Sequence, residues 1–179
     1  MVSIETPRLL LREFTVDDFE MVHRYAVNPN VVMYMNWGPN SETETRRFLQ
    51  NAIKNQIVKP RTSYELAITL DGELIGGCGF TIQNLKLGES EIGYCIDEPH
   101  WGKGYGTEVA GALIQYGFKE RGMHRIFAKC DPENKGSYRV MEKNGMTKEG
   151  HLRENLKVRG QYRDTLIYGI LRHEWGSTG

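Results

Sequence analysis

Residues 100–118 read HWGKGYGTEVAGALIQYGF. Gly102, Gly104 and Gly106 occupy alternate positions in this stretch, and small and apolar residues with helical spacing follow at once. Glycine allows backbone N–H groups to converge, and the first turn of a helix adds unpaired N–H groups at the positive end of the helix dipole. The stretch therefore predicts an anion-binding loop that leads into a helix.

Two better-known phosphate-binding loops fit this spacing less well. The P-loop pattern G-x-x-x-x-G-K-[ST] is absent, because Lys103 lies between the glycines. A dinucleotide-binding fold has G-x-G-x-x-G after an early strand, whereas G-x-G-x-G here follows about a hundred residues of chain. Asp131, at the end of the next predicted strand, keeps that alternative open. A turn that only connects a strand with a helix is the third alternative.

The composition indicates a single domain, predicted to span residues 1–179. Its 23 Lys and Arg residues balance 23 Asp and Glu residues, so no overall field attracts nucleic acid or a membrane surface. The sequence has no apolar run of about 18 residues and no signal-peptide pattern at its start. We therefore expect a cytoplasmic protein with neither nucleic-acid nor membrane partners.

The cysteines and histidines indicate neither disulfides nor a metal site. Cys78, Cys95 and Cys130 are odd in number and widely spaced, and each lies in a strand-like run. Free cysteine is one of the most buried residue types, so these thiols are expected in the core of a reduced protein. The chain has no Cys/His spacing typical of zinc and no H-E-x-x-H motif.

Hydrophobic periodicity and turn signals predict the remaining elements. The Asp-Gly pair at 71–72 predicts a β-hairpin, and the capping box at 41–44 predicts the start of a helix. Strands are expected within 8–14, 63–82, 90–97, 124–131 and 146–171, and helices after 15, after 41, from the glycine loop to about 121, and between 134 and 145. This order predicts a mixed sheet with helices on both faces, of class α+β or α/β.

The motifs occur together in an order typical of one superfamily. The runs EIGYCIDEPHWGKGYGTEVAGALIQYGF and HRIFAKCDPENKGSYRVMEKNGM resemble the core of the GCN5-related N-acetyltransferase (GNAT) superfamily. More narrowly, the chain is similar to the RimJ/RimL-type branch of ribosomal-protein N-terminal acetyltransferases. The further matching segments are ETPRLLLREFTVDDFE, YMNWGP with the capping box after it, GELIGGCGF and GHLRENLKVRGQYRDTLIYGIL. The resemblance covers nearly the whole chain and implies a three-layer α+β fold with a mostly antiparallel central sheet.

The resemblance also implies acetyl-CoA as co-substrate and no metal. The superfamily signature R/Q-x-x-G-x-G/A aligns on 101–106, with Trp101 at its first position, and its backbone amides would hold the pyrophosphate. The preceding strand is expected to splay from its neighbour and pair with the pantetheine arm, while the amide near Ile96 faces the developing oxyanion. The cofactor-binding residues so implied are Tyr94, Cys95, Ile96, Trp101, Gly102, Lys103, Gly104, Tyr105, Gly106, Thr107, Asn134 and Ser137.

The implied reaction is aminolysis of a thioester, which needs a proton acceptor for the amine and a hydrogen-bond donor for the thiolate. Glu91, on the strand before the loop, is the candidate base, although it is equally a solvated or ion-paired strand residue. Many relatives carry a Tyr seven residues after the Asn, where this chain has Met141. Ser137 is therefore the candidate donor and Tyr138 the second choice. No histidine is placed in sequence to activate a cysteine nucleophile.

The acceptor site is expected between the 29–40 segment and the loop joining the last two strands, with Tyr34, Trp37 and Tyr162 as candidate walls. The branch implies a protein or peptide N-terminal α-amine, such as that of a ribosomal protein, which attacks acetyl-CoA directly in a ternary complex. An α-amine, with a pKa of about 8, is also more often neutral than a lysine amine. The alternatives are a polyamine, aminoglycoside or amino-acid acceptor, or acetyl-CoA binding without catalysis, and the protein is expected to be a monomer or a homodimer.

Overall fold

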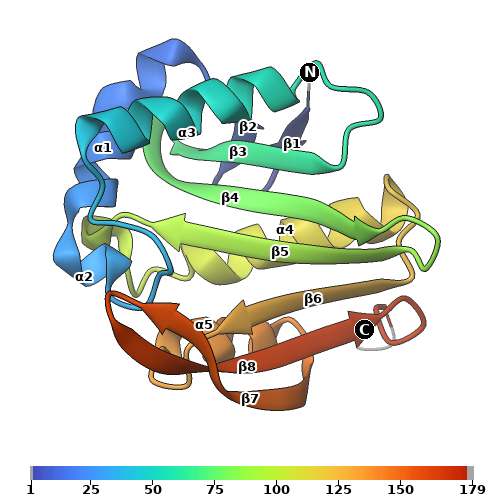
Figure 1. The fold of residues 1–179 in the computed structure, drawn as a ribbon. Coiled ribbons are helices and arrows are strands. Elements are labelled where there is room, and N and C mark those ends of the chain that lie inside the picture. Colours follow the sequence, from blue (N-terminus) through green and yellow to red (C-terminus); the bar gives the residue numbers. More distant parts are fainter. Residues whose placement is uncertain (1, 177–179) are drawn as a thin grey trace.

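The computed structural model describes residues 2–176, whose strands form one eight-stranded sheet in the order β1-β2-β3-β4-β5-β6-β8-β7 (Figure 1). β5 and β6 run parallel, and the other neighbouring strands of this sheet run antiparallel. The strands are β1 (Ser3–Glu5), β2 (Leu10–Glu13), β3 (Ser63–Leu70), β4 (Glu73–Asn84), β5 (Glu89–Ile96), β6 (Arg125–Cys130), β7 (Thr147–Val158) and β8 (Gln161–Leu171).

The α-helices are α1 (Phe19–Val27), α2 (Pro29–Val32), α3 (Glu42–Asn55), α4 (Tyr105–Lys119) and α5 (Lys135–Lys143). Short 3-10 helices precede α1 at Val16–Asp18 and follow β5 at Glu98–His100. Within the described residues, no helix combines the length and the apolar character needed to cross a membrane.

Local signals fix several of these boundaries. α3 begins at the predicted capping box, in which the Ser41 hydroxyl accepts a hydrogen bond from the Glu44 N–H and the Glu44 carboxylate accepts one from the Ser41 N–H. β3 and β4 are joined at Asp71 and Gly72, which have the positive φ values of 50° and 87° that a tight hairpin turn requires. The predicted capping box and hairpin are therefore confirmed.

Helices cover both faces of the sheet, as predicted (Figure 1). α4 and α5 cover one face, where Leu113 and Met141 pack against strand residues such as Phe80. α1 and α3 cover the opposite face, where Val22 and Leu49 belong to a second cluster of buried side chains. The three-layer α+β arrangement expected from the sequence is confirmed.

Two elements were not expected from the sequence. β1 has three residues, too few to show an alternation, and is defined by its pairing with β2, in which Ile4 lies opposite Leu11. α2 is a single turn in a stretch expected to be irregular, and the Asn28 side chain caps it by accepting a hydrogen bond from the Asn30 N–H at 3.0 Å. Both elements are short pieces that tertiary contacts stabilise.

β5 and β6 separate along their length, and this separation positions the site. The two strands pair only from Glu89 to Glu91 on β5, opposite Arg125 to Phe127 on β6. β5 then continues to Ile96 paired with β4, while β6 continues to Cys130 paired with β8. In the described sheet, the backbone edge at 92–96 thus has no strand partner on the β6 side, which confirms the splay that the resemblance implied.

Candidate active site

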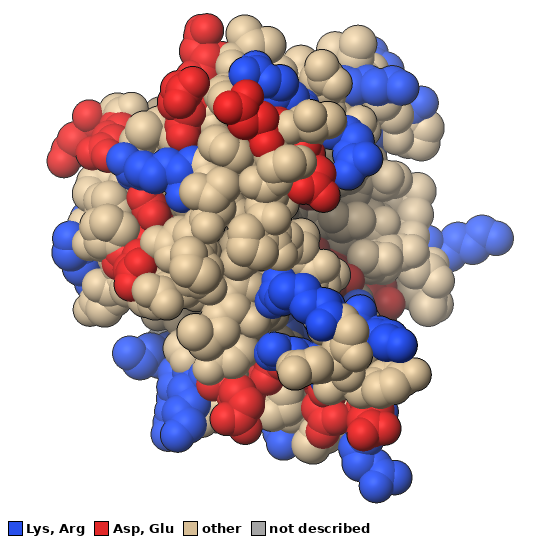
Figure 2. All heavy atoms as spheres, turned by 60° about the vertical axis from the view of Figure 1, so that its left-hand side comes forward, with Lys and Arg blue, Asp and Glu red and all other residues tan. Residues whose placement is uncertain are grey.

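A cleft of about 1610 Å³ opens where β5 and β6 separate. Figure 2 shows a recess on this side of the molecule, with acidic and basic side chains mixed around it. Lys103 is not among the lining residues, whereas the other predicted cofactor-binding residues are: Tyr94, Cys95, Ile96, Trp101, Gly102, Gly104, Tyr105, Gly106, Thr107, Asn134 and Ser137. The structure therefore brings one strand edge, the glycine loop and the start of α5 to a common space.

The glycine loop ends where α4 begins. Gly102 and Gly104 have φ values of 74° and 82°, which residues with a side chain rarely adopt. The first backbone hydrogen bond of α4 runs from the Glu108 N–H to the Gly104 carbonyl, so the N–H groups of residues 105–107 have no acceptor within the helix. Gly106 lies so close to β5 that a Cβ there would be 3.0 Å from the Tyr94 ring. The loop leaves unpaired amides beside the free edge of β5.

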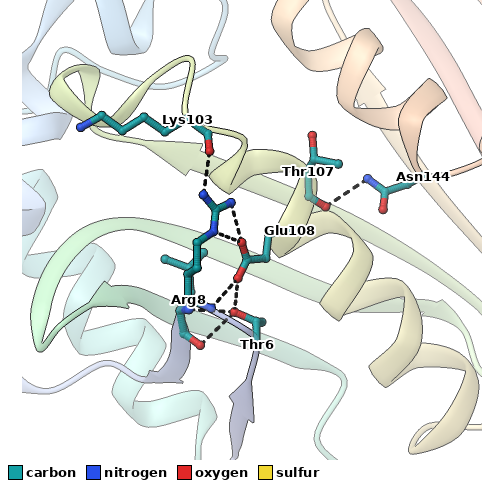
Figure 3. Close-up of polar contacts among 7 residues, drawn as sticks. Thr6, Arg8, Lys103, Thr107, Glu108 and Asn144 are labelled. Atoms are coloured by element: carbon teal, nitrogen blue, oxygen red, sulfur yellow. Dashed lines mark hydrogen bonds and ion pairs between the residues drawn. The ribbon is translucent and has the colours of Figure 1, made fainter.

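Arg8, from the segment between β1 and β2, holds this loop against the sheet (Figure 3). Its guanidinium donates to the Lys103 carbonyl at 2.9 Å and to the Glu108 carboxylate at 2.7 Å. The Thr6 hydroxyl donates to the same carboxylate at 2.6 Å. Burial acts to raise the pKa of Glu108, but the hydrogen bonds from Thr6 and Arg8 outweigh it and hold that pKa below its ordinary value. The Arg8–Glu108 ion pair therefore stays charged at neutral pH.

Trp101 takes the place of the Arg or Gln of the signature and makes a contact within the protein. Its indole Nε1 donates to the Ile96 carbonyl at 2.7 Å. This hydrogen bond ties the start of the glycine loop to the last residue of β5. One side chain thus fixes the two parts of the predicted donor site relative to each other.

Comparison with known proteins decides the family. Residues 8–147 match the acetyltransferase (GNAT) domain. The chain belongs to the GNAT family. It is 38% identical over 178 residues to the uncharacterized N-acetyltransferase YnaD of Bacillus subtilis (strain 168), an alignment that covers 97% of this chain and 99% of that protein. The crystal structure of a GNAT-family acetyltransferase from Bacillus anthracis matches with a TM-score of 0.85 and 36% identity, over 96% of this chain and 99% of that one. The protein is therefore an N-acetyltransferase.

Two further solved structures share the GNAT fold, and they are of enzymes with different acceptors. RimL, a ribosomal L7/L12 α-N-protein acetyltransferase in complex with coenzyme A, matches with a TM-score of 0.85 and 22% identity over 95% of this chain and 98% of that one. Spermidine N-acetyltransferase from Vibrio cholerae, in complex with CoA and spermine, matches with a TM-score of 0.79 and 23% identity over 93% of this chain and 97% of that one. At these identities the likeness concerns the fold.

α5 brings the predicted thiolate partner to the cleft of this GNAT protein. The Asn134 side-chain carbonyl caps α5 by accepting a hydrogen bond from the Ser137 N–H at 3.1 Å. Met141, which stands where many relatives carry a Tyr, is buried with 2% of its surface exposed. Ser137 lines the cleft and Tyr138 does not. The geometry thus favours Ser137 over Tyr138 as the hydrogen-bond donor.

The Ser137 hydroxyl lies beside the Tyr94 hydroxyl and the Cys130 thiol. The Tyr94 hydroxyl is buried without a hydrogen-bond partner of normal geometry in the described part of the chain. Burial raises the pKa of Tyr94 to about 12 and that of Cys130 to about 11. Both groups are therefore protonated at neutral pH, so this end of the cleft offers O–H and S–H donors.

Glu91 lines the cleft, but it is already paired. Its Oε2 atom accepts hydrogen bonds from Lys129 Nζ and Gln83 Nε2, each at 3.1 Å. The two partners come from the neighbouring strands β6 and β4. The Lys129 ammonium offsets the negative charge of the Glu91 carboxylate, and this charge is what a base needs to attract a proton. The geometry therefore also fits a structural ion pair that joins β5 and β6 where the two strands begin to separate.

The expected acceptor wall depends on a contact between distant parts of the chain. Arg159, in the turn between β7 and β8, donates to the carbonyls of Val32 and Met33 at 3.0 Å. It also donates to the Gly38 carbonyl at 2.7 Å. The hairpin tip thereby holds the loop of residues 33–38, which follows α2, in one position at the mouth of the cleft.

The structure brings two of the three predicted acceptor residues to the cleft. Tyr34 and Trp37, both in the loop held by Arg159, are among its lining residues. Tyr162 is not, and 63% of its surface is exposed on β8, with Lys157 Nζ 5.2 Å from its ring centre. The β7–β8 hairpin contacts the loop of residues 33–38 through the Arg159 guanidinium, and the Tyr162 ring faces solvent.

Glu65 on β3 also lines the cleft, although no motif marks it. The available signal is its setting, because it is the one acidic residue in the strand segment SYELAITL. An acidic residue in an apolar strand is more often found at an exposed position, and the sequence does not reveal that this position faces a cleft.

Proposed function

We propose that this N-acetyltransferase transfers the acetyl group of acetyl-CoA to the N-terminal α-amine of a protein or peptide within a ternary complex. One observation carries the proposal: the free backbone edge of β5 and the unpaired amides at the start of α4 open on the same cleft. The strand edge offers hydrogen-bonding groups for the amides of the pantetheine arm. The glycine loop offers N–H groups for a pyrophosphate without requiring a lysine or arginine.

The lining residues suit the parts of this donor. Tyr94, Cys95 and Ile96 would face the pantetheine arm, and residues 102–107 the pyrophosphate. The Asn134 side-chain carbonyl is taken by the α5 cap, which leaves its amide nitrogen free to donate to the donor's carbonyl groups. Ser137 is placed to donate a hydrogen bond to the leaving sulfur.

The transfer would proceed by direct attack. The amine nitrogen loses a proton and forms a bond to the acetyl carbonyl carbon, and negative charge develops on the carbonyl oxygen, where a backbone N–H near Ile96 would stabilise it. The C–S bond then breaks, and the thiolate takes up a proton with the help of the Ser137 hydroxyl. The products are an acetylated amine and free CoA.

The charges of the cleft favour an acceptor with one reacting amine over a polyamine. Five acidic side chains line it, at Glu44, Glu65, Glu91, Asp131 and Glu133, and so do five basic ones, at Arg47, Lys129, Lys135, Arg139 and Lys143. A polycation would meet these positive side chains, whereas a peptide presents a single terminal amine followed by a neutral backbone. The α-amine is also about 2.4 pK units less basic than a lysine side chain, so a larger fraction is neutral at pH 7.

Peptides that carry both a free α-amine and one lysine test this proposal. We expect acetylation of the α-amine alone, and loss of turnover when that amine is blocked, as read by mass mapping of the products. One peptide copies the N-terminus of ribosomal L7/L12, the protein named in the RimL structure. Spermidine serves as the competing acceptor. Acetylation confined to lysine, or turnover with spermidine and none with peptides, would contradict the proposed acceptor class.

A further inference from the structure

Glu65 stands on the floor of the cleft, in a row of residues that crosses three strands. It pairs with Gly79 on β4, and Gly79 pairs with Gly93 on β5. Directly paired residues of an antiparallel sheet point to the same face. A Cβ at Gly79 would be 3.1 Å from Glu65 Oε2 and 3.2 Å from Oε1, so the carboxylate lies over Gly79 in the space that a side chain there would occupy.

This row leads from the carboxylate to the point where β5 is free of β6. Gly93 is exposed in the cleft, and no described atom lies within 4 Å of the position of a Cβ there. Adjacent strands are about 4.8 Å apart, so the Glu65 carboxylate lying over β4 is one such spacing from β5. An amine nitrogen above Gly93 would therefore have the proposed donor site on one side and Glu65 on the other.

The Glu65 side chain is partly buried, and its oxygens form no hydrogen bond or ion pair with residues 2–176. Burial raises the pKa of Glu65 above its ordinary value. Glu91, by contrast, shares one oxygen between Lys129 and Gln83. A carboxylate without a donor keeps its lone pairs for a proton, and a raised pKa brings its basicity closer to neutral pH.

The titratable groups near Glu65 come from four other elements, and of these Cys78 points to the opposite face of the sheet. Tyr25 on α1, Cys78 on β4 and Cys95 on β5 all have pKa values raised by burial, that of Cys95 to about 12, so they are neutral between pH 5 and about pH 9. Glu44 and Arg47 on α3 line the same cleft at exposed positions. Glu91 on β5 is the other carboxylate on this part of the cleft floor.

We propose that Glu65 is the proton acceptor for the attacking amine, an assignment that rests on the proposed function. The acceptor binds as an ammonium ion, whose charge the unpaired carboxylate attracts. Glu65 takes one N–H proton, and the neutral nitrogen forms the C–N bond to the acetyl carbon. The second proton leaves the nitrogen as the C–S bond breaks and reaches the sulfur. Glu65 then releases its proton to water, so that one proton is produced for each acetyl group transferred.

Glu65→Gln keeps the shape of the side chain and removes the basic site. We expect kcat to fall by about 10²-fold at pH 7. The wild-type to Glu65→Gln ratio of kcat should have a definite pH dependence. A base works only when deprotonated, so the ratio falls toward one as pH drops through the Glu65 pKa, which lies above the ordinary value of about 4.3. The ratio also shrinks above the pKa of the amine, because the amine then arrives neutral.

The measurement is kcat against pH with a peptide acceptor, for wild type, Glu65→Gln, Glu91→Gln and the control Glu73→Gln, which alters an exposed glutamate at the β3–β4 turn. The thermal shift caused by acetyl-CoA shows that each variant folds and binds the donor. For Glu91→Gln we expect a loss below tenfold with a ratio independent of pH, as a structural ion pair predicts.

Two results would overturn the assignment to Glu65 and leave the proposed function standing, both with wild type active on peptides. In the first, Glu65→Gln keeps full activity. In the second, Glu65→Gln loses activity by a factor that does not depend on pH. A pH-dependent loss in Glu91→Gln instead would transfer the role to Glu91. Wild type that binds acetyl-CoA but acetylates no peptide would overturn the proposed function, and the assignment of Glu65 with it.

Discussion

Gly93→Val is expected to abolish acetyl transfer while the fold survives. Gly93 lies on the cleft floor, its φ is outside the positive range, and no described atom lies within 4 Å of a Cβ placed there. Valine is favoured in strands, so the folded state should lose no stability. Its branched side chain would occupy the space between Glu65 and the free edge of β5. We expect kcat/KM to fall by at least about 10²-fold, since displacement of reacting groups by about 1 Å has effects of this size.

A matched control for this variant is Gly150→Val, on β7. Gly150 is also a strand glycine, and a Cβ there would be 3.9 Å from Ile167, in ordinary contact and outside the residues that line the cleft. Thermal unfolding and steady-state kinetics are measured on both variants. Normal kcat/KM in Gly93→Val would show that the reaction does not take place above Gly93. An equal loss in Gly150→Val would show that the effect of valine is not specific to the cleft.

Gly104→Val is expected to remove acetyl-CoA binding. Gly104 has a φ of 82° and immediately precedes α4, so valine would force the loop out of its present conformation. The unpaired amides of residues 105–107 would then no longer converge. For wild type, acetyl-CoA at 100 times its Kd adds about 2.7 kcal/mol to the free energy of unfolding, which is roughly 5–10 °C in Tm. In Gly104→Val this thermal shift should vanish.

Gly122→Val is the control for the effect of backbone strain alone. Gly122 has a φ of 65°, and a Cβ there would meet nothing within 4 Å, so the substitution introduces similar strain away from the cleft. This variant should have a lowered Tm without ligand and a normal shift with acetyl-CoA. An undiminished acetyl-CoA shift in Gly104→Val would mean that the glycine loop is not the donor site.

Local signals were sufficient for much of the fold. The capping box at the start of α3 and the hairpin at 71–72 depend on residues within four positions of each other, so the sequence displays them directly. Asn134 was likewise expected to cap a short helix, and its side chain does so. β1 was missed because three residues carry no period and its existence depends on pairing with β2.

The parts of the site that one contiguous motif forms were predictable from the sequence. The parts that strand pairing brings together were not. The glycine loop and the residues before it are one stretch of chain, so they reached the cleft together. Glu65 and Gly93 become neighbours only through their pairing with Gly79, which no local pattern reveals. Arg159 reaches carbonyls more than a hundred positions away, a long-range contact that no local pattern reveals, and Tyr162, three residues later, does not line the cleft.

Initial-rate kinetics with both substrates varied test most directly whether the acetyl group passes straight from acetyl-CoA to the amine in this cleft. Burial raises the pKa of Cys130 to about 11 and that of Cys95 to about 12, so neither thiol supplies the thiolate that an acetyl-enzyme would need. The account predicts double-reciprocal lines that intersect, with no CoA released until a peptide acceptor is added. Parallel lines, with a burst of CoA in the absence of acceptor, would contradict it.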